Sequence, residues 1–390
     1  MSDLSLRLQQ AASQLPVASY FDEAIYQREQ SRIFQCGPRY VGHELAVPEI
    51  GDYYTLPHEA GGRALVRTTQ GVELISNVCR HRQALMLKGR GSLLTEQPGS
   101  AFGNIVCPLH RWTYSGGGAA AAGKTGTLIG APHFPQDPCL NLDNYALQQW
   151  NGLLFEAARP GTGPGVSVAS DLAGLGPLAD LDFSGHVLDH VEMHECDYNW
   201  KTFIEVYLED YHVVPFHPGL GNFVTCKDLT WQFGDWYSVQ KVGITSLAKP
   251  GSATYAKWHK AVLDYYGEKR PTHGAIWLTY YPNIMVEWYP HVLVVSTLIP
   301  TDIDRTTNVV EFYYPEDIAE FEREFVDAEQ AAYMETAIED DEIGERMDRG
   351  RRALMKEGRN EVGPYQSPFE DGMQHFHEFY RRIMEPHIGG

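Results

Sequence analysis

Two short motifs that pair a cysteine with a histidine constrain this chain more than any other feature of its sequence. In the first, one residue separates Cys79 from His81, and in the second, two residues separate Cys107 from His110. Each motif therefore offers one thiolate and one imidazole. A [2Fe–2S] cluster held by two cysteines on one iron and two histidines on the other needs this division of ligands. A Cys₂His₂ zinc site is the alternative, but it has little use for two ligand types on each of two loops.

The residues around the two motifs strengthen the cluster interpretation. Two segments, at 76–82 and 105–115, resemble the cluster-binding loops of Rieske proteins, and more specifically of Rieske non-haem iron oxygenases; they read SNVCRHR and IVCPLHRWTYS. The resemblance implies that the two cysteines bind a buried iron and the two histidines an exposed one. Neither loop has the extra cysteine that forms a disulfide in Rieske proteins of bc complexes, which favours the soluble oxygenase branch.

Composition narrows the cellular setting. The six cysteines show no spacing typical of a disulfide framework, so those outside the motifs are expected to be buried thiols in a reducing compartment. The formal net charge of −20 disfavours nucleic acid and anionic membranes as partners. The chain starts without the pattern of a secretory signal, and the apolar run at 291–299 is too short to span a bilayer. We expect a cytoplasmic protein with no nucleic-acid or membrane partner.

Residues 40–157 have the pattern of a β-rich domain that would carry the cluster. Short apolar runs are separated by Gly, Pro and Asn, and the two motifs lie at the ends of such runs. The 25 residues between His81 and Cys107 leave room for a surface loop at 95–100. The apolar runs are at 64–67, 72–76, 104–106 and 152–156.

A stretch rich in Gly and Pro at 158–165 is the predicted start of a catalytic domain over residues 158–390. Long apolar strands are followed by acidic helices, which predicts an α+β fold. The family resemblance implies a helix-grip-like domain with an antiparallel sheet and helices, on which a helical N-terminal segment, residues 1–39, packs. The strands are expected at 275–288, 291–300 and 308–314, and the helices around 316–356.

A second candidate metal site lies in the segment 199–217, which reads NWKTFIEVYLEDYHVVPFH. On a regular helix His212 and His217 would point about 140° apart, so one helical face cannot supply both. Pro215 is predicted to break the helix and to bring His217 back beside His212. Two histidines and one carboxylate, with open positions for O₂, form the facial triad of non-haem Fe(II) oxygenases. Two unrelated histidines near a helix end are the alternative.

The same segment resembles the iron-binding segment of Rieske oxygenase α subunits, and this resemblance points to the third ligand. The family has a late acidic helix in which an Asp precedes a Glu by five residues, and Asp340 with Glu345 fits that spacing. We therefore expect Asp340 to be the third ligand. Asp341 is its rival, and an acidic run of this kind is ordinarily a solvated helix face. His375 and His377, in a closing segment that also resembles the family, are interpreted as structural.

The resemblance also assigns roles to Glu209 and Asn199. In the family, electrons cross between neighbouring subunits of a trimer through a carboxylate that bridges a cluster histidine and an iron-ligand histidine. Glu209 has that position and would connect His212 to His110 of a neighbouring copy. Most members have Asp there, and Glu occurs in a subset that includes oxygenases for carnitine and other quaternary amines. Asn199 is expected near the iron or, alternatively, as an ordinary N-cap of a helix.

Three further histidines, at 186, 190 and 194, are four residues apart and could form a metal-binding helix face. The residues between them alternate as in a strand. The family resemblance assigns them no role, so we expect no metal there.

The resemblance implies an oxidoreductase, the terminal oxygenase component of a multicomponent system. Its expected cofactors are the [2Fe–2S] cluster and a mononuclear Fe(II), with O₂ as co-substrate. The sequence has no GxGxxG dinucleotide fingerprint. NAD(P)H would therefore act through a separate flavin and iron–sulfur reductase, with or without a ferredoxin. The expected assembly is a homotrimer.

Aromatic residues crowd the segment 231–289 and leave two classes of small organic substrate open. They could cage a quaternary ammonium group by cation–π contact, which favours hydroxylation, with or without loss of an N- or O-alkyl group. They could instead pack against an aromatic ring, as in a ring-hydroxylating dioxygenase. A Rieske ferredoxin, a different class of protein, is disfavoured by the chain length and by the second histidine pair. A zinc-binding interaction protein with no redox role is the third possibility, and iron and sulfide analysis separates all three.

Overall fold

The computed structural model describes residues 14–94, 103–117, 124–136, 138–157, 167–267 and 270–384. The chain forms two compact units: a small unit, Pro38–Ala169, and a large unit that joins Met1–Gly37 to Ser170–Gly390. The predicted boundary stretch at 158–165 and the predicted surface loop at 95–100 lie outside the described residues.

The small unit is built from short antiparallel strands in three sheets, with the orders β5-β2-β3-β4-β9, β6-β7-β8 and β1-β11-β10. Both motif cysteines belong to its buried apolar cluster. The 3-10 helices η2 (Glu44–Ala46) and η3 (Pro57–Glu59) lie in this unit, and α4 (Val168–Asp171) lies where the units divide. The strands are β1 Arg39–His43, β2 Asp52–Thr55, β3 Arg63–Thr68, β4 Gly71–Ser76, β5 Arg90–Ser92, β6 Ile105–Val106, β7 Thr113–Tyr114, β8 Leu128–Gly130, β9 Asn144–Tyr145, β10 Leu147–Trp150 and β11 Leu153–Glu156.

A seven-stranded sheet with the order β12-β18-β17-β16-β15-β14-β13 organises the large unit, and every neighbouring pair is antiparallel. Its central strands are buried along most of their length, as expected for a sheet covered by helices. The strands are β12 His186–Cys196, β13 Val224–Phe233, β14 Tyr237–Ile244, β15 Ala275–Tyr280, β16 Ile284–Tyr289, β17 Val292–Asp302 and β18 Arg305–Pro315.

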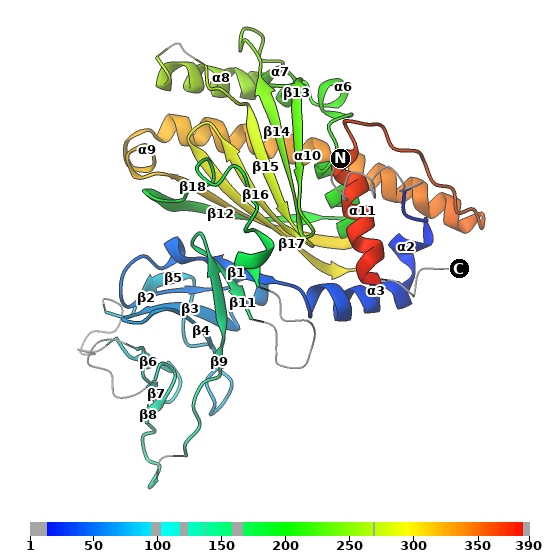
Figure 1. Cartoon of the computed structure of the whole chain (residues 1–390). Helices are drawn as coiled ribbons and strands as arrows, with labels where there is room; N and C mark the ends of the chain where they lie inside the picture. The colour runs from blue at the N-terminus through cyan, green and yellow to red at the C-terminus, as the bar shows by residue number, and fades with distance from the viewer. Residues whose placement is uncertain are drawn as a thin grey trace. The chain divides into compact units, whose positions relative to one another are not determined.

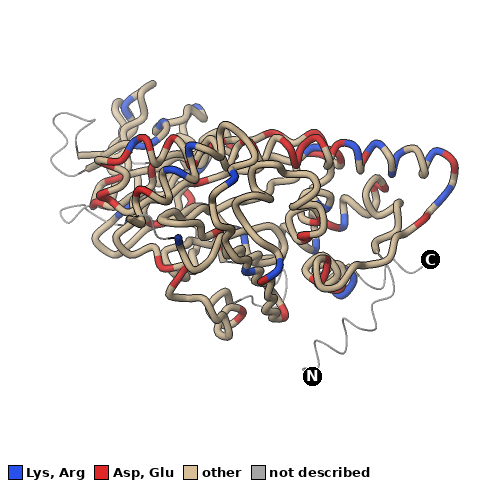
Figure 2. The backbone as a smooth tube through the Cα atoms, turned by 90° about the horizontal axis from the view of Figure 1, so that it is seen from above, with Lys and Arg blue, Asp and Glu red and all other residues tan. Residues whose placement is uncertain are grey.

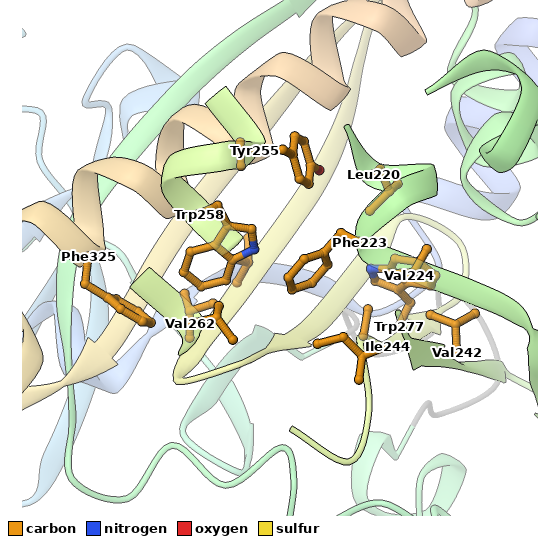
Figure 3. Close-up of a cluster of buried hydrophobic side chains, with 14 of the residues drawn as sticks. Leu220, Phe223, Val224, Val242, Ile244, Tyr255, Trp258, Val262, Trp277 and Phe325 are labelled. Carbon is orange, nitrogen blue, oxygen red and sulfur yellow. The ribbon is translucent and has the colours of Figure 1, made fainter. Parts of the chain in front are cut away.

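Helices α8 and α10 pack against each other and against this sheet (Figure 1). Aromatic side chains of α7, α8 and β15 gather in the core that they enclose (Figure 3). A second core lies where α5 and α11 meet the N-terminal helices. The helices are α2 Ala18–Phe21, α3 Glu23–Glu29, the π-helix η1 Gln30–Phe34, α5 Trp200–Tyr207, α6 Val213–Phe216, α7 Leu220–Phe223, α8 Ala253–Tyr265, α9 Glu316–Phe321, α10 Arg323–Lys356 and α11 Asp371–Met384.

One predicted strand is wrong. The run 275–288 is not a single strand but the hairpin of β15 and β16, which pair with each other. The chain turns at residues 281–283, where Pro282 has no N–H to contribute to a ladder. An apolar run on both sides of the turn hid it from the sequence pattern.

Two buried carboxylates tie the ends of the chain to α5, the helix that leads to His212. Glu29 of α3 is fully buried and accepts hydrogen bonds from Lys201 Nζ at 2.7 Å, from Trp200 Nε1 at 2.9 Å and from the Tyr380 hydroxyl at 2.5 Å. Because Tyr380 lies in α11, this one side chain joins the N-terminal segment, α5 and the last helix.

Glu205 is the second of these carboxylates. It is paired with Arg351 of α10 at 2.5 Å and with His377 Nε2 of α11 at 2.8 Å, and it accepts the hydroxyl of Tyr20. Arg351 is the main cause that holds the pKa of Glu205 down, to about 2, against the opposing effect of burial. His377 therefore has the structural role expected for it.

Charged residues alternate along the C-terminal part of α10 (Figure 2), where Glu342 pairs with Arg346 and Glu345 with Arg349, each four residues apart. Such pairs stabilise an exposed helix face. Within the described ranges, no helix combines the length and the apolar character needed to cross a lipid bilayer.

Candidate active site

The two motif loops of the small unit have the same backbone design. The N–H of the residue four after each cysteine bonds to that cysteine's carbonyl, Gln83 to Cys79 at 3.0 Å and Arg111 to Cys107 at 3.1 Å. Gln83 and Arg111 both have a positive φ, of 57° and 62°. Each loop therefore reverses tightly and presents its histidine next to its cysteine.

These loops bring all four predicted cluster ligands to one region. The Cys79 and Cys107 thiols are free and buried, and they interact with one another. The rings of His81 and His110 are 4.7 Å apart at their centres, and His81 stacks on Trp112. Nδ1 of His81 is buried and has no hydrogen-bond partner among the described residues.

The surroundings of the sulfur atoms suit thiolates. Burial raises the pKa of the Cys107 thiol, but backbone N–H groups of Leu109 and His110 point at the sulfur and oppose that effect. Hydrogen bonds of this kind stabilise negative charge on sulfur and tune an iron–sulfur centre. Two adjacent buried sulfurs and two adjacent imidazoles, one with an unused nitrogen, fit a [2Fe–2S] cluster.

The second site lies in the large unit, where His212 and His217 flank a one-turn helix. His212 is the N-cap of α6 and His217 its C-cap. The helix break precedes His212, since α5 already ends at Tyr207. The prediction that Pro215 makes the break is wrong. Pro215 lies in the first turn of α6, where the backbone N–H groups of a helix have no intrahelical hydrogen-bond partner, so a proline does not interrupt the helix there. His217 has extended backbone angles, so its ring can turn back toward His212.

Three side-chain atoms converge at this point. Nε2 of His212 and Nε2 of His217 are 3.0 Å apart, and Oδ1 of Asp340, from α10, lies 3.4 Å and 3.0 Å from them. The rival Asp341 turns away and contacts His194 Nε2 at 2.7 Å and the Tyr198 hydroxyl at 3.0 Å. The structure thus brings Asp340, and not Asp341, to the two histidines.

Each imidazole uses its other nitrogen to contact a second carboxylate. Nδ1 of His212 lies 2.5 Å from Glu209, and Nδ1 of His217 lies 2.7 Å from Glu339. A carboxylate at Nδ1 favours a proton on that nitrogen, so that with a metal bound each Nε2 would be the coordinating atom. Oδ1 of Asp340 has no hydrogen-bond partner among the residues described. Two imidazole nitrogens and one carboxylate oxygen that converge on one point are a donor set that fits a ferrous ion.

The potential at this point is strongly negative. Burial alone would lower the pKa of both histidines, but nearby carboxylates outweigh it. Asp340 and Glu209 raise the pKa of His212 to about 10, and Asp340 and Glu339 raise the pKa of His217. The same potential attracts a divalent cation.

His194 lies on strand β12, as expected from the alternation around it. With Cys196 and Asp341 it forms a second group whose ligand atoms lie within 4.8 Å of one another. Its contact with Asp341 fixes the orientation of that carboxylate on α10, and we assign no metal there.

Asn199 has the capping position that was the alternative expectation for it. It is the N-cap of α5, and its Oδ1 accepts the N–H of Lys201 at 2.9 Å. Its Nδ2 donates to the carbonyls of Tyr20 at 2.9 Å and Ile303 at 2.7 Å. The side chain is fully buried and committed to these contacts, so the alternative expectation, a helix cap, is what the structure shows.

A cavity opens beside the converging ligands and is lined by apolar, aromatic and acidic side chains. Its wall includes Glu209, Asp210 and the three candidate ligands. Aromatic rings from both the helices and the sheet also line it. These rings are Tyr198, Phe203, Tyr207, Phe223, Tyr255, Trp258, Trp277, Tyr289 and Tyr333.

Two further carboxylates, Glu287 of β16 and Glu329 of α10, also line the cavity, with exposed fractions of only 1% and 3%. Burial raises the pKa of Glu287 to about 7 and that of Glu329 to about 8. Neither has an ion-pair partner among the described residues. Neither was predicted from the sequence, although one acid inside the apolar run of β16 was a usable signal.

Comparisons with known proteins identify the family. Residues 184–386 match the family of the ring hydroxylating alpha subunit (catalytic domain), and residues 40–131 match the Rieske [2Fe-2S] domain. The chain is a Rieske oxygenase α subunit. The predicted α+β fold, a β-rich Rieske domain with a catalytic domain built on an antiparallel sheet, is confirmed. The prediction that the chain is an oxidoreductase is confirmed as well.

Relatives of this Rieske oxygenase span its whole length. The putrescine 2-hydroxylase of Ralstonia nicotianae is 65% identical over 388 residues, which cover 99% of this chain and 100% of the relative. That of Bordetella bronchiseptica is 59% identical over 381 residues, which cover 96% and 85%. A crystal structure of the quaternary ammonium Rieske monooxygenase CntA has a TM-score of 0.71 at 18% identity, covers 96% of this chain and 97% of that one, and shares the fold.

Proposed function

We propose that this chain is the terminal oxygenase that hydroxylates a four-carbon diamine of the putrescine type at the carbon next to an amine-bearing carbon. The identity of 65% with a putrescine 2-hydroxylase, over 99% of this chain, carries this proposal. The acidic, aromatic cavity beside the candidate ligands supports it, because such a wall suits an alkylammonium chain.

The proposed ligands are those that the sequence predicts. Cys79, His81, Cys107 and His110 would hold the [2Fe–2S] cluster, and His212, His217 and Asp340 would hold Fe(II). When bound, this iron with O₂, two electrons and two protons would supply the chemistry that converts a C–H bond to C–OH and leaves the second oxygen atom as water.

Side chains around the ligands would keep this centre ordered. Glu209 and Glu339 hold the proton of each histidine on Nδ1, so that Nε2 stays free for the metal. The apolar wall would exclude water from the reacting carbon, and this limits loss of electrons to side reactions.

Electrons would come from NAD(P)H through a separate flavin and iron–sulfur reductase, with or without a ferredoxin. The assembly would be a homotrimer in which Glu209 connects His212 to His110 of a neighbouring copy. Residues 40–157 would be the Rieske domain and 158–390 the catalytic domain. Residues 1–39 would pack on the latter, as the contacts of Glu29 with α5 and α11 suggest.

Hydroxylation or dealkylation of a quaternary ammonium compound is a second candidate. The aromatic wall favours it, since rings can cage a trimethylammonium group. Aromatic-ring dihydroxylation is less favoured, because a neutral ring gains nothing from two buried carboxylates.

The test is product formation by the reconstituted enzyme with NADH, O₂ and a generic reductase. Butane-1,4-diamine should yield a hydroxydiamine that carries one oxygen atom from labelled O₂, and each chain should contain about three irons and two sulfides. Conversion of choline, carnitine or an aromatic acid, with the diamine untouched, would contradict the proposal.

A further inference from the structure

In the middle of the seven-stranded sheet, one carboxylate lies among apolar residues of the neighbouring strands. Glu287 of β16 lies opposite Trp277 on β15 and opposite Val294 on β17, which in turn pairs with Phe312 on β18. Directly paired residues point to the same face of a sheet. Because Trp277, Val294 and Phe312 all belong to the core under α8 and α10, Glu287 faces that core too.

Neutral donors hold this carboxylate in place without balancing its charge. The hydroxyl of Tyr289 donates to Oε2 at 2.7 Å and that of Tyr333 donates to Oε1 at 3.0 Å, while Trp277 Nε1 donates to the Tyr289 oxygen at 2.8 Å. Burying a carboxylate without a cation is costly, and an apolar residue of similar size would avoid the cost. The arrangement is explained if a cation from outside the chain completes it.

The position of Glu287 relative to the candidate iron ligands fits a short diamine. Glu329, Tyr333, Thr336 and Asp340 follow one another at helical spacing on α10 and all line the cavity. Tyr333, which bonds to Glu287, is seven residues before Asp340, about 10 Å along the helix axis. An extended four-carbon diamine spans roughly 6 Å between its nitrogens. Its far ammonium can therefore reach Glu287 while its carbon chain lies beside the ligands.

We propose that Glu287 selects the substrate by accepting N–H groups of the ammonium ion remote from the carbon that is hydroxylated. This inference rests on the proposed function. The rings of Trp277, Tyr289 and Tyr333 around the carboxylate add cation–π attraction. A primary ammonium ion has three N–H donors and a trimethylammonium group has none, so the site prefers a diamine to a quaternary amine.

The decisive comparison uses two ligands that differ only in the far ammonium. Calorimetry on the anaerobic, metal-loaded enzyme gives the Kd of butane-1,4-diamine and of 1-aminobutane, and the ratio of the two is the discrimination. Glu287→Gln keeps the shape of the side chain and removes its charge. It should weaken diamine binding roughly 10- to 100-fold and leave monoamine binding within threefold, since the lost contact is a charge-assisted hydrogen bond.

Glu329→Gln tests whether Glu287 or Glu329 has this role. Glu329 lies one turn before Tyr333 on α10, about 6 Å further from Asp340 along the helix axis. The substitution should change the discrimination less than threefold, and an effect as large as that of Glu287→Gln would transfer the role to Glu329. If Glu287→Gln misfolds, Tyr333→Phe serves instead: it removes one hydrogen bond to Glu287 and should lower the discrimination about threefold or more.

The two proposals fail in different ways. A wild-type enzyme that neither binds nor oxidises the diamine would contradict the proposed function. An enzyme that binds the diamine with unchanged discrimination after Glu287→Gln would overturn the role of Glu287 and leave the function intact.

Discussion

Glu339 contacts Nδ1 of His217 at 2.7 Å and so determines which ring nitrogen faces Asp340. Replacing Glu339 with Gln keeps the size of the side chain but weakens its hydrogen bond with Nδ1 of His217. We expect Glu339→Gln to lower the affinity for iron about 10- to 100-fold and to leave the visible spectrum of the cluster unchanged. Iron retained against a chelator measures the effect.

Glu342→Gln is the matched control, since Glu342 lies one turn away on α10 and pairs with the exposed Arg346. It should retain iron like the wild type. Equal retention by Glu339→Gln would mean that Glu339 does not support His217.

Glu329 makes the stability of the chain depend on pH. Burial raises its pKa from 4.5 to about 8, with the charge of Glu287 adding to the effect and the hydrogen bond from Tyr314 opposing it. The folded chain thus keeps a proton that the unfolded chain loses above pH 4.5. Its contribution to stability is complete at lower pH and falls as pH rises from 4.5 to about 8.

Glu329→Gln, which cannot ionise, should therefore be more resistant to urea than the wild type at pH 9, relative to their difference at pH 5. The gain is expected to be on the order of a few kcal/mol. Glu342→Gln should show no such trend. Parallel pH profiles for Glu329→Gln and the wild type would contradict the buried, protonated state.

At the scale of residues, the sequence predicted those site residues whose type alone points to the chemistry of the site. Cys79 and His81 stand out because few sites need both ligands together. Asp340 was predicted from the spacing that the family resemblance implies, and the turn of α10 is what directs it, and not Asp341, toward the two histidines. Glu287 and Glu339 were not found, since their roles depend on neighbours that only the fold supplies.

Helix α10 is the element that connects the candidate metal site to the cavity wall, and Gly344 sets how closely it approaches Tyr198, just after β12. A Cβ there would lie 2.9 Å from the ring of Tyr198, whose hydroxyl bonds to Asp341. Gly344→Ala should raise helix propensity yet cost about 1–3 kcal/mol in packing and reduce iron content, because α10 must shift beside Asp340. Thermal melting and iron analysis measure both effects.

Gly350→Ala is the control on the same helix, because no atom of the described residues lies within 4 Å of a Cβ at that position. It should stabilise the chain by up to about 1 kcal/mol with full iron. A Gly344→Ala protein that behaves in the same way would show that α10 tolerates a wider spacing.

Elements were predictable where one pattern dominated. The acidic helices and the strand 308–314 correspond to α9, α10 and β18. The hairpin within 275–288 was not predicted, because apolar residues lie on both sides of its turn. The early end of α5 was not predicted, because the break was assigned to Pro215. In each case tertiary packing decides where the chain turns.

At the scale of the whole molecule, the proposed path of electrons requires a second copy of the chain. Glu209→Gln, loaded with iron and cluster to the wild-type content, should slow the oxidation of the reduced cluster about tenfold or more in a single turnover. Light scattering should give the mass of three chains. An unchanged rate in a trimer would remove Glu209 from the path.

The contacts of Glu29 and Glu205 have a practical consequence for anyone who handles this enzyme. Removal of α11 would leave Glu29 without Tyr380 and Glu205 without His377. Both carboxylates are buried and contact or belong to α5, the helix that leads to His212. Proteolysis at either terminus, or a fused tag that displaces α3 or α11, should therefore cause loss of iron before the rest of the molecule unfolds.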